Sequence, residues 1–588
     1  MNDDNPTLRY YEAEMRYLRE AGKEFARAFP DRAALLSLDR PGASDPFVER
    51  LFEGFAFLMG RLREKLDDDL PEMTEGLVSL LWPGYLRPIP SLCMVEFSPD
   101  LKAMKNPESL PKGFEVVSQP VGPQRTCCRY TTTEDVVLRP WQVEALRHEF
   151  RADGRSVLRL RLACGENTDW SLFDLANVVF YLNGDAPQAS ALYHALTGRV
   201  QAVYLRLPGW AERAPLQACF AAHGFGGASR LWPQGEGAFS GYQLLLEYFT
   251  FREKFMRVAL QGLEQVALPK GVAWLELDIE LAEAWPADYP LEAENLRLHV
   301  TPVINLFTLE ADPVQLDTLH SEHLLRPRRL QDGHTEIYSV DGVTALGSDN
   351  PAVYAPFSTF RHKGGLQRDE APERYFHTRV KRGAGGLHDT WLVLGGEGLE
   401  RDRVAGYERV SLALTGTQGQ LPRRALQCTL LDRCAVPRPD LAVRNLSAPT
   451  QPCYPPNRDR FHWRVLSHLG ATFLSMMDNP QVLRSTLALY EWTHSELNRR
   501  RIEAIVGVCH SLIHRWHKGC LLRGVAIEVT LDSGGFCGSG DLWLFGEMLR
   551  RFFALYGDVQ LFQQLTLVLQ PSGKTLQWNE HHSLHIPG

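Results

Sequence analysis

Five cysteine and histidine residues near the C-terminus are the side chains in this sequence best suited to hold a metal ion. They are Cys509, His510, His514, His517 and Cys520. The first two histidines are four residues apart and could share one helix face, as zinc ligands do in H-E-x-x-H sites. No Glu separates them in that manner, and the cysteines fit no standard zinc spacing. The pattern therefore favours the end of an amphipathic helix over a metal site.

A serine in the run Asp532-Ser533-Gly534-Gly535 resembles the nucleophile of trypsin-like proteases. That protease fold is all-β, whereas this serine stands between a predicted strand and a predicted helix. The G-x-S-x-G pattern of a nucleophile elbow is absent as well. A turn with two flexible glycines is the better interpretation.

A glycine-rich run at 535–540 precedes the same predicted helix, whose N-terminus could bind an anion. No Lys-Ser or Lys-Thr pair follows, and Asp541 would repel a phosphate. Capping of the helix by Ser539 or Gly540 explains the run without a ligand. Asp69 and Glu72 similarly have the spacing of a helix capping box, so the acidic triplet at 67–69 needs no cation. We expect no catalytic residue, no cofactor and no metal ion.

The first of two long amphipathic helices predicted at the N-terminus carries a regular apolar pattern. It begins at Asn5 and Pro6, which suit a cap and a first helical position. Its apolar residues recur in alternating steps of three and four, which is an a/d seam over three heptads. The seam consists of Leu8, Tyr11, Met15, Leu18, Phe25 and Phe29, which we predict to bind a partner, and Gly22 lies on the same seam. The seam fits either the chain's own core or a bundle shared with another subunit.

The second helix begins at Asp45 and Pro46 and carries a wider apolar stripe. Its members are Val48, Leu51, Phe52, Phe55, Met59, Leu62 and Leu66. Such a wide stripe predicts neighbours on more than one side of the helix. A short third helix follows, and Pro88 and Pro90 force an extended exit. Because this region has much apolar surface and no catalytic grouping, it predicts assembly and not chemistry.

From about residue 92 the apolar period changes from that of a helix to that of a strand. Runs between Gly and Pro turns predict strands at 93–97, 157–162, 200–207, 274–281 and 296–300. Nearer the C-terminus, helical patterns cover 481–508, with room for one break, and 541–556, and strand patterns cover 525–531 and 565–569. We predict an α+β multidomain fold with a helical N-terminal region, β-rich middle domains and a compact C-terminal α/β unit.

Length, charge and cysteine usage limit the classes of function. A chain of 588 residues is too long for one core. Its formal charge of −8 argues against nucleic acid or an anionic membrane as a general partner. We find no secretory signal and no run of about eighteen apolar residues, so no direct membrane insertion is expected. Eleven scattered cysteines without a C-x-x-C pair fit free thiols in a reducing cytoplasm.

Four separated segments carry a family pattern. They are residues 10–19 with 25–27, residues 44–51 with 55–58 and 87–91, the run Thr301-Pro302-Val303-Ile304-Asn305-Leu306-Phe307, and parts of 523–556. In this order they resemble the type VI secretion system baseplate subunit family TssF, also called ImpG or VasA. No segment is decisive alone. The four occur in the family's order and are spread along the chain, so the resemblance covers its whole length. On this basis we expect a helical assembly region at 1–90, β-rich domains at 91–300 and 301–450, and an α/β domain at 451–588.

The resemblance implies a structural scaffold that works mechanically. It implies wedges built with TssG-, TssE- and TssK-like subunits and a second copy of the chain, placed around a VgrG-like hub and spike. The baseplate would dock from the cytoplasm on an inner-membrane complex and start assembly of the tail tube and contractile sheath. Two alternatives stay open at this point. One is the wedge subunit of a phage or phage-derived particle, and the other is a metal-dependent hydrolase that uses the cluster at 509–517.

Overall fold

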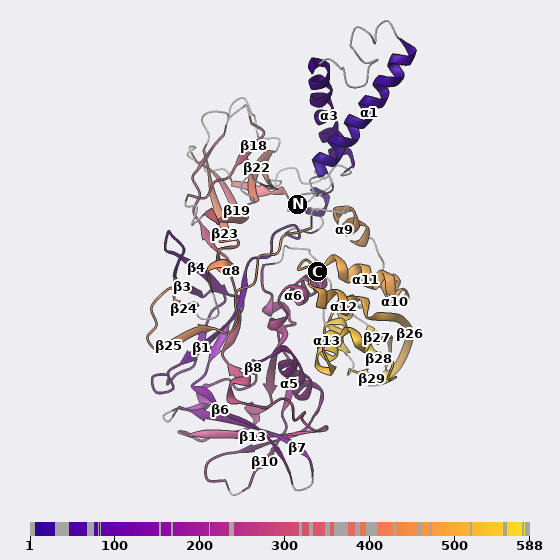
Figure 1. Ribbon diagram of the computed structural model, residues 1–588. Helices are drawn as coiled ribbons and strands as arrows, with labels where there is room; N and C mark the ends of the chain where they lie inside the picture. The colour runs from indigo at the N-terminus through magenta and orange to yellow at the C-terminus, as the bar shows by residue number, and fades with distance from the viewer. Residues whose placement is uncertain are drawn as a thin grey trace. The chain divides into compact units, whose positions relative to one another are not determined.

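Helices and several β-sheets make up the computed structural model, which confirms the predicted α+β class (Figure 1). Contacts divide the chain into unit 1, Met1–Leu81 with Pro456–Gly470, and unit 2, Trp82–Pro455 with Ala471–Gly588. The structure describes residues 6–29, 46–67, 74, 76–79, 82, 84–151, 154–165, 168–210, 212–233, 240–316, 320–328, 333–346, 353–357, 374–382, 388–395, 409–426, 431–456, 461–469, 473–517, 520–556, 561–578 and 581–582.

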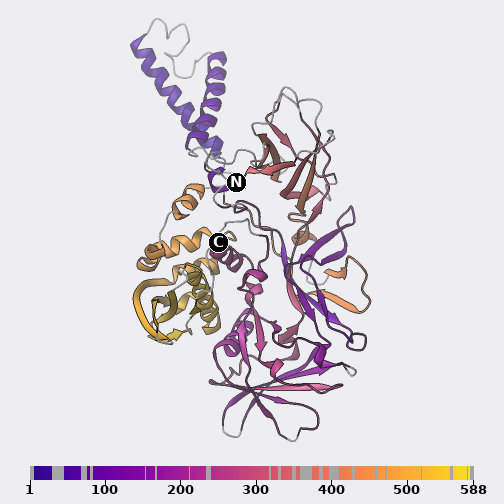
Figure 2. The same cartoon turned by 180° about the vertical axis from the view of Figure 1, so that it is seen from behind.

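Unit 1 contains the two predicted N-terminal helices, α1 (Pro6–Ala28) and α3 (Pro46–Asp67), together with α9 (Phe461–Leu469). Each of the first two helices begins at a proline, which suits the first helical turn because no backbone N–H is lost there. Both views show α1 and α3 close together at one end and farther apart at the other (Figures 1 and 2). Arg19 and Glu49 join the two helices through an exposed ion pair of 3.3 Å.

A six-stranded sheet in unit 2 gathers segments from distant parts of the chain. Its strands, in spatial order, are β24 (Leu431–Cys434), β3 (Glu115–Val121), β4 (Thr126–Thr132), β15 (Val300–Ile304), β1 (Leu92–Pro99) and β25 (Leu441–Asn445). Phe97, Tyr130 and Val303 lie in its fully buried core. A short pair, β2 (Glu108–Leu110) with β5 (Val136–Leu138), contributes Leu110 and Leu138 to the same core.

Two further sheets occupy the middle of the chain, which confirms the predicted β-rich character. One consists of β10 (Ala214–Leu216), β9 (Val200–Arg206), β13 (Trp274–Leu281), β7 (Ser156–Cys164) and β6 (Trp141–Phe150). The other consists of β11 (Cys219–Ala222), β12 (Arg257–Gln261), β8 (Val178–Leu182) and β14 (Leu296–Leu298). Helices α5 (Ala186–Gly198) and α6 (Ser240–Thr250) lie between strands of these sheets in the sequence.

An eight-stranded sheet follows in the sequence and has its own buried core around Val343 and Leu392. Its strands are β16 (Phe307–Leu309), β17 (Val314–Gln315), β18 (Glu322–Leu324), β19 (Glu336–Leu346), β20 (Val353–Pro356), β21 (Tyr375–Arg382), β22 (His388–Gly395) and β23 (Arg409–Thr417). The short helix α8 (Leu421–Ala425) comes after it and packs its buried Leu421 into the core of the six-stranded sheet.

The C-terminal part forms the predicted α/β unit. Strands β26 (Ile505–His517), β27 (Cys520–Asp532), β28 (Leu561–Gln570), β29 (Thr575–Gln577) and β30 (His581–His582) form one sheet. β27 and β28 run parallel, joined through α13 (Ser539–Tyr556). Helices α10 (Phe473–Asp478), α11 (Pro480–Leu489) and α12 (Glu496–Glu503) precede the sheet. The sequence pattern thus identified the strand–helix–strand core correctly.

Three local predictions were wrong. The helical pattern at 481–508 ends too late, because the chain becomes strand β26 at Ile505. The break that the pattern allowed lies between α11 and α12, which starts anew at its Ser495 cap. The run 296–300 is not one strand, since His299 has a left-handed φ of 55° that separates β14 from β15. The last helix begins at Ser539 and not at 541, so neither Ser539 nor Gly540 precedes it as a cap.

Candidate assembly surface

The predicted cysteine and histidine cluster does not converge on one point. Cys509, His510 and His514 lie on strand β26, so the prediction of a shared helix face was wrong. Side chains of neighbouring strand residues point to opposite faces, which separates Cys509 from both histidines. His510 Nδ1 lies 2.8 Å from Asp478 Oδ1, and the side chains of His517 and Cys520 fall outside the described residues. In the part of the chain that the structure describes, no three such residues gather around a metal-sized space.

The serine at 533 lies in a turn, as the sequence indicated. Asp532 Oδ1 accepts a hydrogen bond of 2.9 Å from the Gly534 N–H, which closes a short 3₁₀ turn over Ser533–Gly535. The Ser533 hydroxyl donates to the Gln570 carbonyl at 2.9 Å. The hydroxyl is therefore used to join the ends of β27 and β28, which is a structural role.

A negatively charged side chain of the protein itself, Asp541, lies in the N-terminal turn of α13. The Asp541 carboxylate is 1% exposed, and it accepts a 3.1 Å hydrogen bond from the Cys537 N–H. Arg501 Nε lies 3.1 Å from both carboxylate oxygens, and Arg252 also donates to the group. A β-carbon at Gly540 would overlap the backbone of Ser190, so this glycine allows a close approach of α5. Packing and a buried carboxylate explain the glycine-rich run.

One face of the N-terminal helix pair is an internal core. Met15 is 7% exposed and Ala56 is fully buried. A β-carbon at Gly60 would lie 3.0 Å from the Tyr11 backbone nitrogen, so the absence of a side chain lets α1 and α3 come close together. The sequence analysis did not single out Gly60, which makes this close approach possible.

The predicted seam on α1 divides into two halves with different environments. Met15 is buried, and Tyr11 and Leu18 are half-buried. Phe25 and Phe29 are 38% and 52% exposed, and their rings contact each other with centroids 5.3 Å apart. The side chain of Leu8 lies outside the described residues. Met15 thus belongs to the core of the helix pair, and partner binding stays a prediction for the seam, with Phe25 and Phe29 as its most exposed described members.

A second apolar surface lies on α3 and is only partly visible in the sequence pattern. Leu51, Phe55 and Leu58 are 71%, 52% and 66% exposed. At about 100° per residue these three side chains fall within an arc of about 60°, and Ala56 lies on the roughly opposite side. We call Leu51, Phe55 and Leu58 the α3 outer stripe. Leu58 was missed in the sequence, although its spacing of seven residues from Leu51 is the heptad signal that could have found it.

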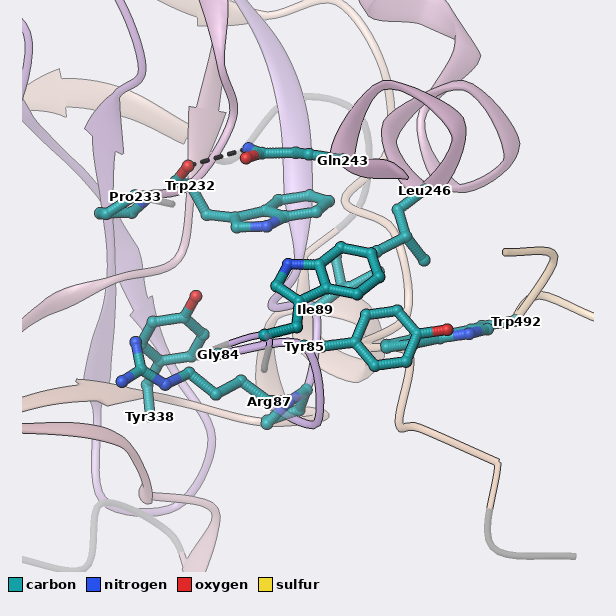
Figure 3. Close-up of a pocket in the computed structure, with 12 residues that line it drawn as sticks. Gly84, Tyr85, Arg87, Ile89, Trp232, Pro233, Gln243, Leu246, Tyr338 and Trp492 are labelled. Atoms are coloured by element: carbon teal, nitrogen blue, oxygen red, sulfur yellow. Dashed lines mark hydrogen bonds between the residues drawn. The ribbon is translucent and has the colours of Figure 1, made fainter. Parts of the chain in front are cut away.

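The chain enters unit 2 through an aromatic cluster, which Figure 3 shows around a small cavity. The rings of Trp82 and Tyr85 stack at 4.0 Å, and Tyr85 also meets Trp492 edge-on at 5.3 Å. The space between these side chains is partly open and, at about 20 Å³, would hold about one water molecule. Gln243 beside it donates to the Trp232 carbonyl at 3.0 Å. The stacked rings fix the course of the chain where it enters unit 2.

An adjacent pairing completes this connection. The backbone groups of Ile89 and Cys453 exchange two hydrogen bonds, of 2.7 and 2.9 Å. Thr450 N–H donates to the Leu92 carbonyl at 2.9 Å, and Tyr454 donates its hydroxyl hydrogen to the Glu336 carboxylate. We call the paired segments 84–92 and 450–455 the neck. The segment that follows Leu81 and the segment that precedes Pro456 are therefore held side by side within unit 2.

No described helix is both long enough and apolar enough to cross a lipid bilayer. The long helices α1 and α3 are amphipathic, with arginine, lysine and glutamate residues between their apolar positions. Their exposed apolar side chains form stripes on otherwise charged helices, which is typical of surfaces that contact other proteins.

Comparisons with known proteins agree along the whole chain. The family described as "Type VI secretion system, TssF" matches residues 3–584. The type VI secretion system component TssF1 of Pseudomonas aeruginosa is 30% identical, over 98% of this chain and 98% of that protein. A chain of the TssK-TssF-TssG baseplate subcomplex, solved by cryo-electron microscopy, is 57% identical with a TM-score of 0.82, covering 92% of this chain and 100% of that one. A chain of another solved type VI baseplate complex is 55% identical with a TM-score of 0.69, covering 98% and 99%. The chain therefore belongs to the TssF family of the type VI secretion system.

Proposed function

We propose that this chain is a structural subunit of a type VI secretion baseplate wedge and not an enzyme. The observation that carries the proposal is the exposed apolar surface of α1 and α3, in a chain similar to members of solved baseplate complexes. Contiguous apolar surface of this kind costs free energy in water and is typical of protein–protein contacts. None of the motifs that the sequence singled out forms a catalytic arrangement in the described residues.

The partners follow from the matched complexes and from the family. The solved subcomplex contains TssK and TssG, so we propose that this chain binds the corresponding subunits. By the same proposal the wedge includes a TssE-like subunit and a second copy of this chain, and it surrounds the hub and spike. The complete ring would dock at the inner membrane from the cytoplasm and start sheath assembly. The domain ranges 1–90, 91–300, 301–450 and 451–588 are part of this proposal.

The division of the α1 seam allows a sharp test with two matched variants. Phe25→Asp places a charge at a side chain that is already 38% exposed, so the isolated chain should stay folded. Co-expressed with TssG- and TssK-like subunits, this variant should fail to co-purify, because an interface would desolvate the new carboxylate. Met15→Asp places the same charge in the helix pair's own core and should reduce the helical circular dichroism of the chain alone.

Size-exclusion chromatography with mass measurement compares the two variants with the wild-type complex. A Phe25→Asp chain that assembles as the wild type does would contradict a partner contact at this surface. Failure of the wild-type chain to associate with either subunit would contradict the wedge assignment as a whole.

A further inference from the structure

The long strand β26 has an outer edge with which no other described strand of unit 2 pairs. It is the edge strand of its sheet and pairs only with β27 among the described strands. Helices α10 and α11 meet its first half, where Asp478 contacts His510 and Arg484 donates to the Ile505 carbonyl. Both views show the strand on the outside of the C-terminal sheet (Figures 1 and 2). In the second half of the strand, Ser511, Leu512, His514 and Trp516 are exposed.

The register of the hairpin shows which backbone groups point to that open edge. His517 pairs with Cys520 across only two intervening residues, so this must be a hydrogen-bonded pair. Bonded and non-bonded pairs alternate along an antiparallel ladder. Leu512, His514 and Trp516 therefore direct their N–H and C=O groups away from β27. An exposed row of this kind is a template for another strand.

The side chains of the same residues give the edge an apolar and basic character. Leu512 and Trp516 are 72% and 73% exposed, and Leu521, paired with Trp516, is 51% exposed. Between them, His514 pairs with the exposed Arg523. These side chains continue the face on which Ile527 and Val529 are buried, because residues directly opposite each other share a face. The same face of the sheet is thus buried around Ile527 and Val529 and exposed to solvent around Leu512 and Trp516.

The charge of the hairpin indicates the partner's chemistry. Residues 510–523 contain three Lys or Arg residues and no Asp or Glu, although the whole chain has a formal charge of −8. A second β26 would bring like charges together across the new ladder. A lipid surface would leave the open N–H and C=O groups without hydrogen-bond partners. An acidic, extended protein segment satisfies both the backbone groups and the charge.

We propose that the open edge of β26 binds an extended strand of another baseplate subunit by β-augmentation, which rests on the proposed wedge function. The incoming strand places apolar side chains against Leu512 and Trp516 and an acidic side chain near His514 and Arg523. Its sequence pattern is apolar–x–acidic–x–apolar. In the sequence the site is far from α1 and α3, and the proposed contact does not involve these helices.

Amide hydrogen exchange on the full chain, alone and in the co-expressed complex with TssG- and TssK-like subunits, tests the proposal. Exchange at Leu512, His514 and Trp516 should slow at least tenfold on assembly. His514→Pro removes one outward N–H without removing a bond to β27, so the hairpin should persist and the protection at 511–517 should be lost. His514→Thr, the matched control, keeps the N–H and should retain the protection.

A photo-crosslinker in place of Trp516 identifies the partner segment by mass spectrometry. Crosslinks to an extended apolar and acidic segment of another subunit support the proposal. Crosslinks to a helix, or to β26 of a second copy, overturn it. Binding of the isolated chain to vesicles of phosphatidylcholine and phosphatidylglycerol, lost in Trp516→Ser, also overturns it and indicates a membrane contact.

The proposal and the wedge function fail in distinguishable ways. A complex that assembles while residues 511–517 exchange at the rate of the free chain overturns only the proposal. Absence of any complex contradicts the wedge function, and the proposal with it.

Discussion

The α3 outer stripe gives the most direct quantitative prediction. Replacing Leu51 and Leu58 with serine removes two side chains that are 71% and 66% exposed. Full burial of one leucine side chain stabilises by about 1.5–3 kcal/mol. A partner that covers the exposed parts of both therefore gains about 2–4 kcal/mol from them. The double variant should bind about 30- to 1000-fold more weakly than the wild type.

The same substitutions should leave the isolated chain nearly unchanged. Both side chains are directed away from the packed side of α3, so little buried surface is lost. The lower helix propensity of serine changes the free energy of unfolding by no more than about 1 kcal/mol. Urea unfolding of the isolated chain, followed by circular dichroism, measures this term separately from binding.

The assay is dissociation of the purified wedge complex on dilution, followed by mass photometry. A matched control replaces Leu172 and Val436, which are 55% and 69% exposed in unit 2, with serine. The control should dissociate as the wild type does. Equal affinity of the Leu51/Leu58 variant and the control, with both chains folded, would refute assembly through this stripe.

Two further predictions concern the stability of unit 2. Asp541→Ala leaves the buried Arg501 and the half-buried Arg252 without their counter-ion, which should lower the free energy of unfolding by about 3–5 kcal/mol in a urea titration. His194 has a pKa lowered to about 3, mainly by burial and further by the nearby positive charges of Arg199 and Lys574. Because an unfolded histidine takes up its proton near pH 6.5, the unfolded state binds more protons between these values and stability falls as the pH drops from 6.5 toward 3. His194→Gln should flatten that part of the curve of unfolding free energy against pH, and an unchanged slope would contradict a buried neutral histidine.

Local patterns predicted the parts of the fold that depend on neighbours in the sequence. The strand predicted at 274–281 agrees residue for residue with β13. The alternation around Val529 and the helical pattern ending near Tyr556 predicted the C-terminal α/β unit. The spacing of His510 and His514 misled us, because positions four apart share a face in a strand as well as in a helix.

Sheet membership could not be derived in the same way. β1 lies between β15 and β25, whose residues are more than two hundred positions later in the chain. No period in a single sequence encodes such a pairing, since each strand would fit several neighbours equally well. For the assembly surface, the sequence identified the apolar residues but could not predict which of them would be buried and which exposed. Met15 and Phe25 repeat at the same seam, yet they are 7% and 38% exposed, because burial depends on where α3 packs and not on the pattern of α1 alone.

The neck has a mechanical consequence for a machine that contracts. Its segment 84–92 continues directly into β1, and its segment 450–455 follows β25, so the two chain ends of the neck belong to neighbouring strands of one sheet. A pull on both segments acts along the strands, and it loads the hydrogen bonds of β1 with β15 in shear. Bonds in shear bear a force together, whereas bonds at a frayed end break one after another. Two tied strands also resist twisting about their common axis, so the neck can transmit torque as well as tension.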